Sequence, residues 1–236
     1  MNDDVLSRGI GPAAMTVLPQ AAAADDADEA EAWCERLARF GMVEAAEQHF
    51  RAAAEAGDLT SIKCLVWLAR QRDQEGERDA RRWLERAADA GDPWAMYELG
   101  ASLPRPEGAA EAERWYRRAA AAGHALAMND LGALLSRAGR SEEALDWYRR
   151  AAEGGVAIAM NNLAIQHVMR GDRAEAERWF RRAAEAGDVQ AMANLGRLKL
   201  EADETAEAER WFAAAAEAGH EGAAERLAEL RAAGPR

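Results

Sequence analysis

The sequence predicts an all-α protein built as a solenoid of stacked helical hairpins, and three observations lead to this prediction. First, about a quarter of the 236 residues are alanine and only 6 are proline, and alanine loses no side-chain entropy in a helix. Second, a block that begins with tryptophan returns every 32 residues along most of the chain. Third, apolar residues within each block follow one another at steps of three and four, the spacing of one helix face. A hairpin of this kind cannot bury its apolar face alone, so successive hairpins must stack.

The first part of the chain differs from the repeats. Residues 1–32 hold seven acidic residues and one basic residue, so this segment carries half of the net charge of −12. Two prolines and a run of four alanines accompany these charges. We therefore predict a flexible acidic leader at residues 1–26 and a repeat solenoid at residues 27–233.

Each repeated block carries a tryptophan at the same position, with a glycine eight residues later. The five tryptophans are Trp83, Trp115, Trp147, Trp179 and Trp211. A weaker copy starts at His49, which stands 34 residues before Trp83. Together the blocks predict about six hairpins plus a final helix near residues 220–233. We expect the tryptophans to wedge between helices rather than to form a cage for a ligand.

Turn residues mark the ends of the expected helices. The glycine of each block can take the left-handed conformation that ends a helix, and Asp58, Asp92 and Asp188 directly follow three of these glycines, where a carboxylate can cap the next helix. His124 and His220 occupy the same position, which predicts a role in the turn rather than in a metal site. Shorter breaks inside the hairpins are expected at Gly41, Gly76, Gly108, Gly139 and Gly171.

Two prolines interrupt the third hairpin. Pro104 predicts that the first helix of this hairpin stops early, because proline is not accommodated in a helix interior. Pro106, followed by Glu107, predicts the start of the second helix.

Charge and cysteine content argue against several functions. A pI near 4.9 disfavours a nucleic-acid backbone or an anionic membrane as the partner. We see no secretory signal, and two cysteines, Cys34 and Cys64, make no disulfide framework, so we expect a cytoplasmic protein. No metal-ligand spacing, phosphate loop or nucleophile motif is found, and we expect no cofactor and no metal. Repeated arginine pairs have acids four residues away, at Glu113–Arg117, Asp146–Arg150 and Glu177–Arg181, which predicts solvated ion pairs.

These repeats resemble a known family. The string AAEAGDVQAMANLG at residues 183–196 is similar to the signature of Sel-1-like repeats, a branch of the tetratricopeptide-repeat superfamily. The resemblance covers about residues 30–233, although these units are shorter than the usual Sel-1-like repeat. It implies a right-handed superhelix and an adaptor or scaffold that holds other proteins without chemistry of its own. Some secreted bacterial members resemble β-lactam-binding or β-lactam-hydrolysing proteins, but those are rich in cysteine.

In such solenoids the first helix of each hairpin lines the concave face, and the resemblance therefore suggests where a partner binds. The residues that we expect to line this groove are Trp94, Glu98, Asp130, Asn162, Gln190, Asn194 and Arg197. Amide side chains suit an extended peptide or a helix, because they both donate and accept hydrogen bonds. The other interpretation is that Asn162 and Asn194 brace adjacent helices.

We therefore predict a non-enzymatic interaction scaffold that binds a protein or peptide in its concave groove. One alternative is self-association through an end of the solenoid, since the last tryptophan, Trp211, begins the string WFAAAA, which lacks the arginine pair of the earlier copies. The other alternative is a β-lactam-binding or β-lactam-hydrolysing repeat enzyme.

Overall fold

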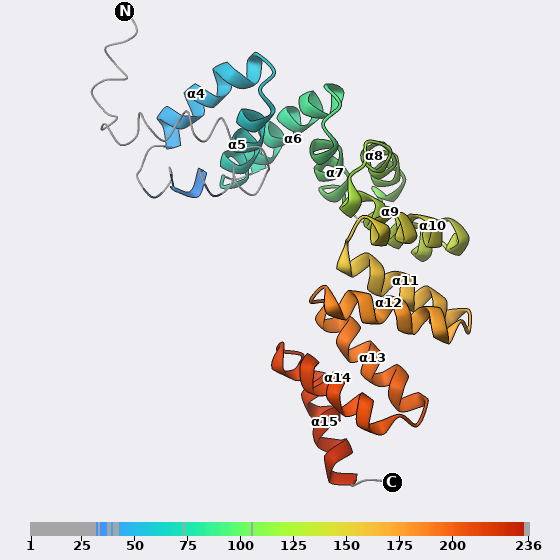
Figure 1. Ribbon diagram of the computed structural model, residues 1–236. Coiled ribbons are helices and arrows are strands. Elements are labelled where there is room, and N and C mark those ends of the chain that lie inside the picture. Colours follow the sequence, from blue (N-terminus) through green and yellow to red (C-terminus); the bar gives the residue numbers. More distant parts are fainter. Residues whose placement is uncertain are drawn as a thin grey trace, which may run out of the picture. The chain divides into compact units, whose positions relative to one another are not determined.

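The computed structural model describes residues 32, 34–36, 39, 43–72, 74–104 and 106–233, and these residues form α-helices joined by short turns, with no strand among them (Figure 1). The predicted acidic leader at residues 1–26 and the predicted break at Gly41 lie outside the described residues. Within the described ranges, no helix has the length and apolar character that crossing a bilayer requires.

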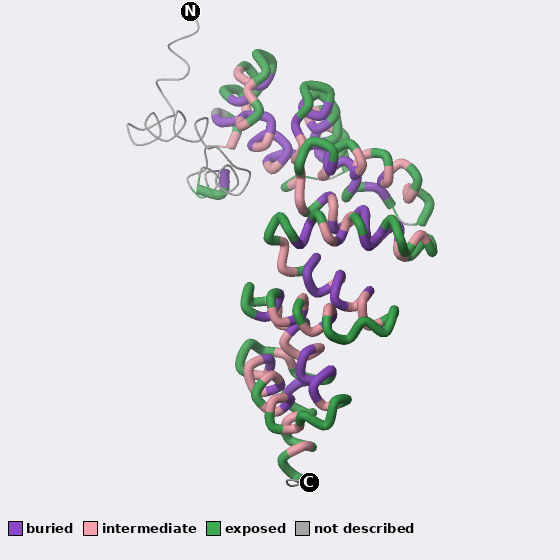
Figure 2. Tube along the Cα trace, turned by 45° about the vertical axis from the view of Figure 1, so that its right-hand side comes forward, coloured by how far each residue is buried: buried purple, intermediate pink, exposed green. Residues whose placement is uncertain are grey.

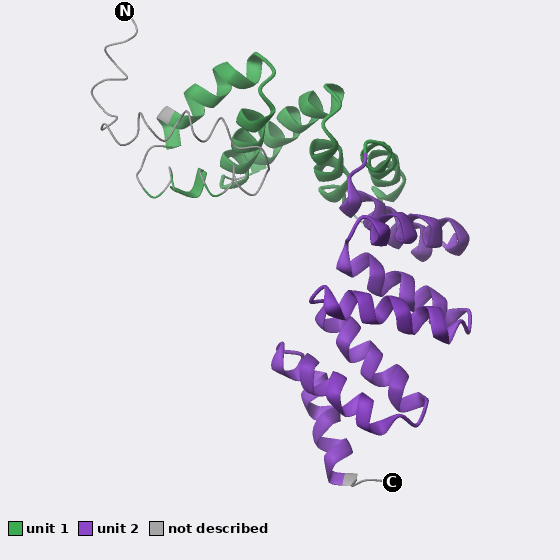
Figure 3. Cartoon of the chain, in the orientation of Figure 1, with its two compact units in different colours: residues 1–122 green, residues 123–236 purple. Residues whose placement is uncertain are grey.

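The chain forms two compact units, residues 1–122 and residues 123–236 (Figure 3). In the first unit each helix packs on the next, and the helices are α4 (Val43–Glu55), α5 (Leu59–Arg70), α6 (Gln74–Asp89), α7 (Pro93–Ala101) and α8 (Ala109–Ala121). The second unit continues this pattern with α9 (Ala125–Arg137), α10 (Ser141–Glu153), α11 (Ala157–Met169), α12 (Arg173–Glu185), α13 (Val189–Glu201), α14 (Thr205–Glu217) and α15 (Glu221–Ala233). Each unit is a stack of helical hairpins, as the sequence predicts.

The predicted turns between hairpins are confirmed. The glycine that follows each second helix has φ between 88° and 96°, as at Gly91 and Gly187, a conformation that costs glycine little. In five of these turns the side chain of the next residue caps the following helix, as where Asp92 accepts from the Ala95 backbone N–H at 2.7 Å. His124 does the same through Nδ1, which accepts from the Ala127 N–H at 3.2 Å, whereas Val156 makes no side-chain cap bond.

The turns inside the hairpins follow the prediction only in part. Gly139 and Gly171 have positive φ, but the equivalent turn between α13 and α14 uses Asp203, with φ of 61°. Gly76 lies within α6 rather than in a break. A Cβ at this position would stand 2.1 Å from the Ala69 carbonyl oxygen of α5. The predicted glycine break is therefore wrong at Gly76, where glycine allows close approach of the preceding helix.

The third hairpin has the short first helix that Pro104 predicts. Its first helix, α7, spans 9 residues, whereas α9, α11 and α13 span 13. The prediction that Pro106 starts the second helix is wrong, because residues 106–108 form a turn and α8 begins at Ala109.

Buried residues recur along each helix and alternate with exposed ones (Figure 2). The residue after each repeat tryptophan is buried, and in two repeats a tyrosine ring at this position packs against a glycine of the preceding helix. A Cβ at Gly132 would stand 2.8 Å from the Tyr148 ring, and Gly100 meets Tyr116 in the same way. The tryptophans themselves are half-buried. The predicted wedge position therefore belongs to the residue that follows each tryptophan.

Candidate partner-binding groove

A groove of about 480 Å³ lies between α13 and α15 in the second unit. The α13 side of the groove carries three of the residues that the sequence predicts as a binding site, Gln190, Asn194 and Arg197. Phe212 of α14 and Ala223 of α15 also line it, and the rim of α15 adds Glu225, Arg226 and Glu229. The predicted stripe of first-helix residues therefore borders a real depression at this place.

Two local features fix the walls of this groove. Asp188 caps α13 by accepting from the Ala191 N–H at 2.7 Å, and His220 Nδ1 accepts from the Ala223 N–H at 3.1 Å at the start of α15. An apolar cluster around Phe212 holds α15 against α14, and Leu227 and Leu230 pack on it. The groove is thus bounded by helices with packed supports.

Both signs of charge are present at the groove. On α15, Arg226 pairs with Glu229 at 2.6 Å. On α13, Arg197 is exposed and lies 3.4 Å from the Asn194 side-chain oxygen, and the described residues give it no carboxylate partner. The Arg197 guanidinium is therefore accessible to an acceptor from outside.

The predicted asparagines form an amide ladder between successive repeats, made of Asn129, Asn161, Asn162 and Asn194. The Asn162 side-chain amide donates to the Asn129 side-chain oxygen at 3.0 Å, and Asn194 donates in the same way to Asn161 at 3.0 Å. Asn129 and Asn161 are buried. The geometry therefore gives Asn162 and Asn194 the bracing role that the sequence left as the second interpretation.

Sequence reasoning missed Asn129 and Asn161 as the partners in this ladder. Both stand one residue before a predicted groove residue, and they are 32 residues apart, so their repetition was a usable signal. Asp130 belongs to the same network, because it accepts from the Asn129 amide at 3.0 Å.

Apolar side chains accompany these polar groups on the first helices of the second unit. Leu126 is 47% exposed and Ile158 is 53% exposed. They precede Asp130 and Asn162 by four residues, one helical turn, so each pair lies on the same face of its helix. This face offers apolar contact area beside hydrogen-bonding groups.

The two remaining predicted residues, Trp94 and Glu98, belong to the first unit. The Lys63 ammonium stands 5.7 Å from the centroid of the Trp94 ring. The Glu98 carboxylate pairs with Arg70 at 2.7 Å. Trp94 and Glu98 of α7 thus already interact with Lys63 and Arg70 of α5.

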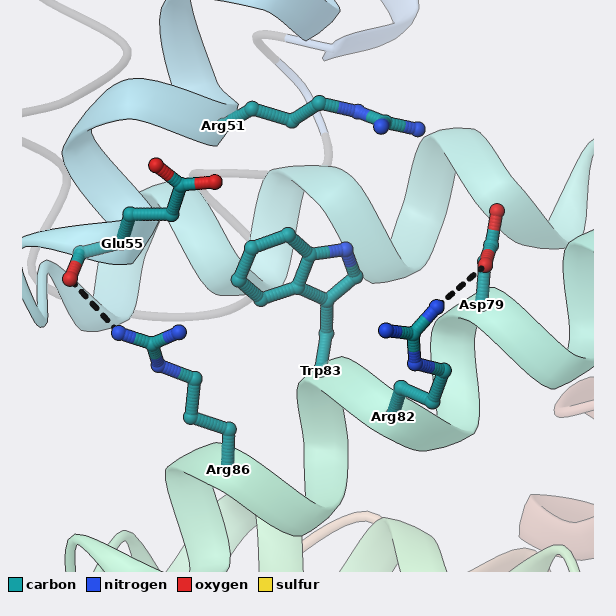
Figure 4. A pocket seen from close by; sticks show the side chains of 6 residues that line it. All are labelled: Arg51, Glu55, Asp79, Arg82, Trp83 and Arg86. Carbon is teal, nitrogen blue, oxygen red and sulfur yellow. Dashed lines mark hydrogen bonds and ion pairs between the residues drawn. The ribbon is translucent and has the colours of Figure 1, made fainter.

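A second pocket, of about 280 Å³, lies between α4 and α6 (Figure 4). It is lined by Arg51, Glu55, Asp79, Arg82, Trp83 and Arg86. The Arg86 guanidinium donates to the Glu55 backbone oxygen at 2.6 Å, and its central carbon lies 5.9 Å from the Trp83 ring centroid. Sequence reasoning missed this pocket.

An arginine covers the tryptophan in the following three repeats as well. The guanidinium carbon lies 4.5 Å from the ring centroid in the Arg118–Trp115 pair, 4.7 Å in Arg150–Trp147 and 4.4 Å in Arg182–Trp179. The predicted Asp146–Arg150 ion pair is therefore wrong, because Arg150 stacks on tryptophan and Asp146 binds Arg149 at 3.1 Å. The predicted Glu113–Arg117 and Glu177–Arg181 pairs are confirmed, at 2.8 Å and 2.7 Å.

One lysine is buried among acids in the second unit. The Lys199 ammonium lies 2.8 Å from Glu177, 2.9 Å from Glu204 and 3.3 Å from Glu207. Burial alone would lower the pKa of Lys199, but the hydrogen bonds to Glu177 and Glu204 outweigh it and raise the pKa. Burial opposes ionisation of Glu207 as well, but Lys199 holds the pKa of that carboxyl below its ordinary value. This cluster ties α12, α13 and α14 together.

Neither thiols nor metal-ligand clusters form a chemical centre in the described part of the chain. Cys34 and Cys64 are buried and form no disulfide, and no three histidine, cysteine, aspartate or glutamate side chains gather there as metal ligands.

Stacked helical hairpins with glycine turns, and with a tryptophan at the same position of five repeats, define a protein of the helical-repeat class. The chain belongs to the Sel1-like and tetratricopeptide-repeat superfamily. The Sel1 repeat model matches residues 43–58, 72–92, 95–124 and 189–220, and a tetratricopeptide repeat model matches residues 124–154 and 156–186. Repeats of these two kinds generally mediate protein–protein interaction.

A solved structure of a repeat protein shares this fold. A Sel1 repeat protein from Oxalobacter formigenes is 24% identical with a TM-score of 0.57, over 73% of this chain and 76% of that one. The MamA protein is less similar, at 18% identity with a TM-score of 0.48, over 64% of this chain and 87% of that one. A search of curated proteins returned no significant match.

Proposed function

We propose that the chain is a non-enzymatic scaffold that binds a protein segment, extended or helical, in the groove between α13 and α15. The observation that carries this proposal is the convergence of Gln190, Asn194 and Arg197 on one groove in the second unit. Membership of a repeat superfamily that generally mediates protein–protein interaction supports a protein as the partner.

The chemistry of the groove supports a polar segment with an acidic or carbonyl group near Arg197. The Arg197 guanidinium presents several donors in a fixed plane, which suits a carboxylate or two backbone carbonyls. Upstream on the first helices, Leu126 and Ile158 offer contact area for apolar side chains of the same segment. Binding by this route needs no cofactor and no metal.

The amide ladder decides which variants can test this proposal. Replacement of Asn162 or Asn194 by alanine would also remove a hydrogen bond between repeats, so it would confuse binding with stability. Gln190 and Arg197 are exposed, and within the described part of the chain their side chains make no hydrogen bond or ion pair to another helix. They are therefore the residues to change.

The test places a photo-reactive amino acid at position 190 and, as the matched control, at position 178 on α12. Arg178 is also exposed but lies outside the groove. We expect position 190 to cross-link a partner in source cells, position 178 not to do so, and Arg197→Glu to remove the product at position 190. Equal products at both positions, or a product that survives Arg197→Glu, would contradict the groove assignment.

We further propose that the chain acts in the cytoplasm, with an acidic leader at residues 1–26 beside the repeats at residues 27–233. The lack of a disulfide at the buried Cys34 and Cys64 supports a reducing compartment. The net charge of −12 supports a protein rather than a nucleic acid or an anionic membrane as the partner. Self-association through α14 and α15 stays a prediction, and a monomer in light scattering at high concentration would contradict it.

A further inference from the structure

The last tryptophan of the repeat series stands in a copy of the pocket of Figure 4 that lacks one side chain. The repeat spacing aligns Arg51, Glu55, Asp79, Arg82, Trp83 and Arg86 with Arg181, Glu185, Glu207, Arg210, Trp211 and Ala214. Five of the six positions keep the same kind of residue. The sixth changes from arginine to alanine.

The two sets correspond in geometry as well as in sequence. In the pocket of Figure 4, Arg51 pairs with Glu47 at 2.7 Å, and at the equivalent place Arg181 pairs with Glu177 at 2.7 Å. Trp83 and Trp211 are both half-buried. The residues after the two tryptophans, Leu84 and Phe212, are both buried. The last repeat therefore shares these features with the pocket of Figure 4, although Glu207 pairs with Arg181 and Lys199 while the equivalent Asp79 pairs with Arg82.

The missing group is a guanidinium. In the four earlier repeats an arginine three residues after the tryptophan lies over the ring, at 4.4 Å to 5.9 Å from its centroid. A cation over an indole face is attracted by the ring quadrupole. Trp211 has Ala214 at this position, and no cation lies over its ring in the described part of the chain.

Two further groups favour a cation at this place. In two of the earlier repeats the stacked arginine also donates to a backbone oxygen at the end of the preceding second helix, Arg86 to Glu55 at 2.6 Å and Arg118 to Ala88 at 3.2 Å. The equivalent helix end, at the C-terminus of α12, carries the partial negative charge of its carbonyls. Glu185 adds a carboxylate there that is exposed and has no ion-pair partner among the described residues.

We propose that Trp211, Glu185 and the end of α12 form a receptor for an arginine side chain that a partner protein supplies. The partner's guanidinium stacks on Trp211 as Arg182 stacks on Trp179, and it donates to the Glu185 carboxylate or to the last carbonyls of α12. The site lies on a second helix, α14, so it adds a contact beyond the groove between α13 and α15 and does not depend on it.

The test follows the eight tryptophan indole N–H signals by ¹⁵N NMR while a peptide, Ac-Gly-Arg-Gly-NH₂, is added. Trp211→Phe identifies the Trp211 signal. We expect this signal to shift on titration, and the same peptide with neutral citrulline in place of arginine to bind about 3- to 30-fold more weakly. Equal binding of the two peptides would overturn the proposal.

Two matched variants test the position of the missing side chain. Ala214→Arg restores the intramolecular arginine of the other repeats and should abolish the shift at Trp211, with helical circular dichroism unchanged. Arg182→Ala removes the covering arginine from Trp179 and should make the Trp179 signal respond to the peptide. A Trp211 shift that persists in Ala214→Arg, or a silent Trp179 in Arg182→Ala, would overturn the inference.

Two controls separate this site from the groove and from self-association. Arg197→Glu, which tests the groove, should leave the peptide response of Trp211 unchanged, so the two proposals can fail independently. A Trp211 signal that shifts with protein concentration alone would identify a second copy of the chain as the source of the arginine and would overturn the assignment to a separate partner.

Discussion

Replacement of Lys199 by methionine should destabilise the second unit by about 2 kcal/mol. The Lys199 side chain is only 7% exposed, and its ammonium contacts Glu177, Glu204 and Glu207. Loss of one partner from a buried ion pair costs about 3–5 kcal/mol, because the remaining charge stays unpaired. Here the three carboxylates are 29%, 47% and 36% exposed, and Arg181 still neutralises two of them. Both facts reduce the expected cost.

The pH dependence of this loss follows from the direction of the two pKa shifts. The pKa of Glu207 is lowered in the folded state, so its stabilising contribution is present above about pH 4.5 and is lost as the pH falls through the folded-state pKa. The pKa of Lys199 is raised, so its contribution is complete below pH 10.5 and is lost only as the pH rises further. The difference between wild type and Lys199→Met should therefore be constant from about pH 6 to pH 9 and shrink below pH 4.5.

Urea unfolding followed by circular dichroism measures this difference, and in thermal unfolding we expect the melting temperature to fall by about 4–8 °C. The matched control is Lys63→Met, which removes the other lysine of the chain and a cation over Trp94. Because Lys63 is half-exposed and lies over a single ring, its loss should cost about 0.5 kcal/mol. Equal effects of the two substitutions, or a Lys199→Met deficit that does not change below about pH 4.5, would refute this reasoning.

Three further substitutions test the repeat framework by urea unfolding. Gly132→Val should destabilise the second unit by about 1–3 kcal/mol, since even a Cβ would stand 2.8 Å from the Tyr148 ring, and an unchanged midpoint would contradict this packing. Asp203→Gly should stabilise it by about 0.5–1 kcal/mol, because φ of 61° strains an aspartate but not a glycine, and a loss of stability would refute the strain. Asn194→Ala should cost about 1 kcal/mol through the bond to Asn161, whereas Gln190→Ala on the same helix should change little.

The sequence predicted the helices and their turns because these depend on local chemistry. A glycine with positive φ and a capping aspartate act within a few residues, so Gly91 and Asp92 could be interpreted without knowledge of any neighbour. The error at Gly76 arose because a glycine can also serve close approach between helices, which spacing alone does not reveal. Asp203 was missed because a residue other than glycine takes the strained turn.

The candidate site was predicted less fully, because side-chain partners depend on contacts between repeats. The repeat register placed Gln190, Asn194 and Arg197 on one face, and they line one groove. It did not show that the Asn194 amide is already occupied by Asn161. Nor did it show that Arg150 binds the Trp147 ring instead of the carboxylate four residues away.

Departures from the repeat pattern carry more information about function than the pattern itself, because each repeat can be compared with the others position by position. The amide ladder ends at the last hairpin, where Ala193 stands at the position of Asn129 and Asn161 in two earlier repeats. The exposed Arg197 lies on the same helix as Ala193. The arginine–tryptophan stacks end in the same hairpin, where Ala214 replaces arginine. These two kinds of interaction, the amide ladder and the arginine–tryptophan stacks, thus stop on the first and the second helix of one hairpin. Both proposed contacts use this hairpin, the groove through Arg197 of α13 and the arginine receptor through Trp211 of α14.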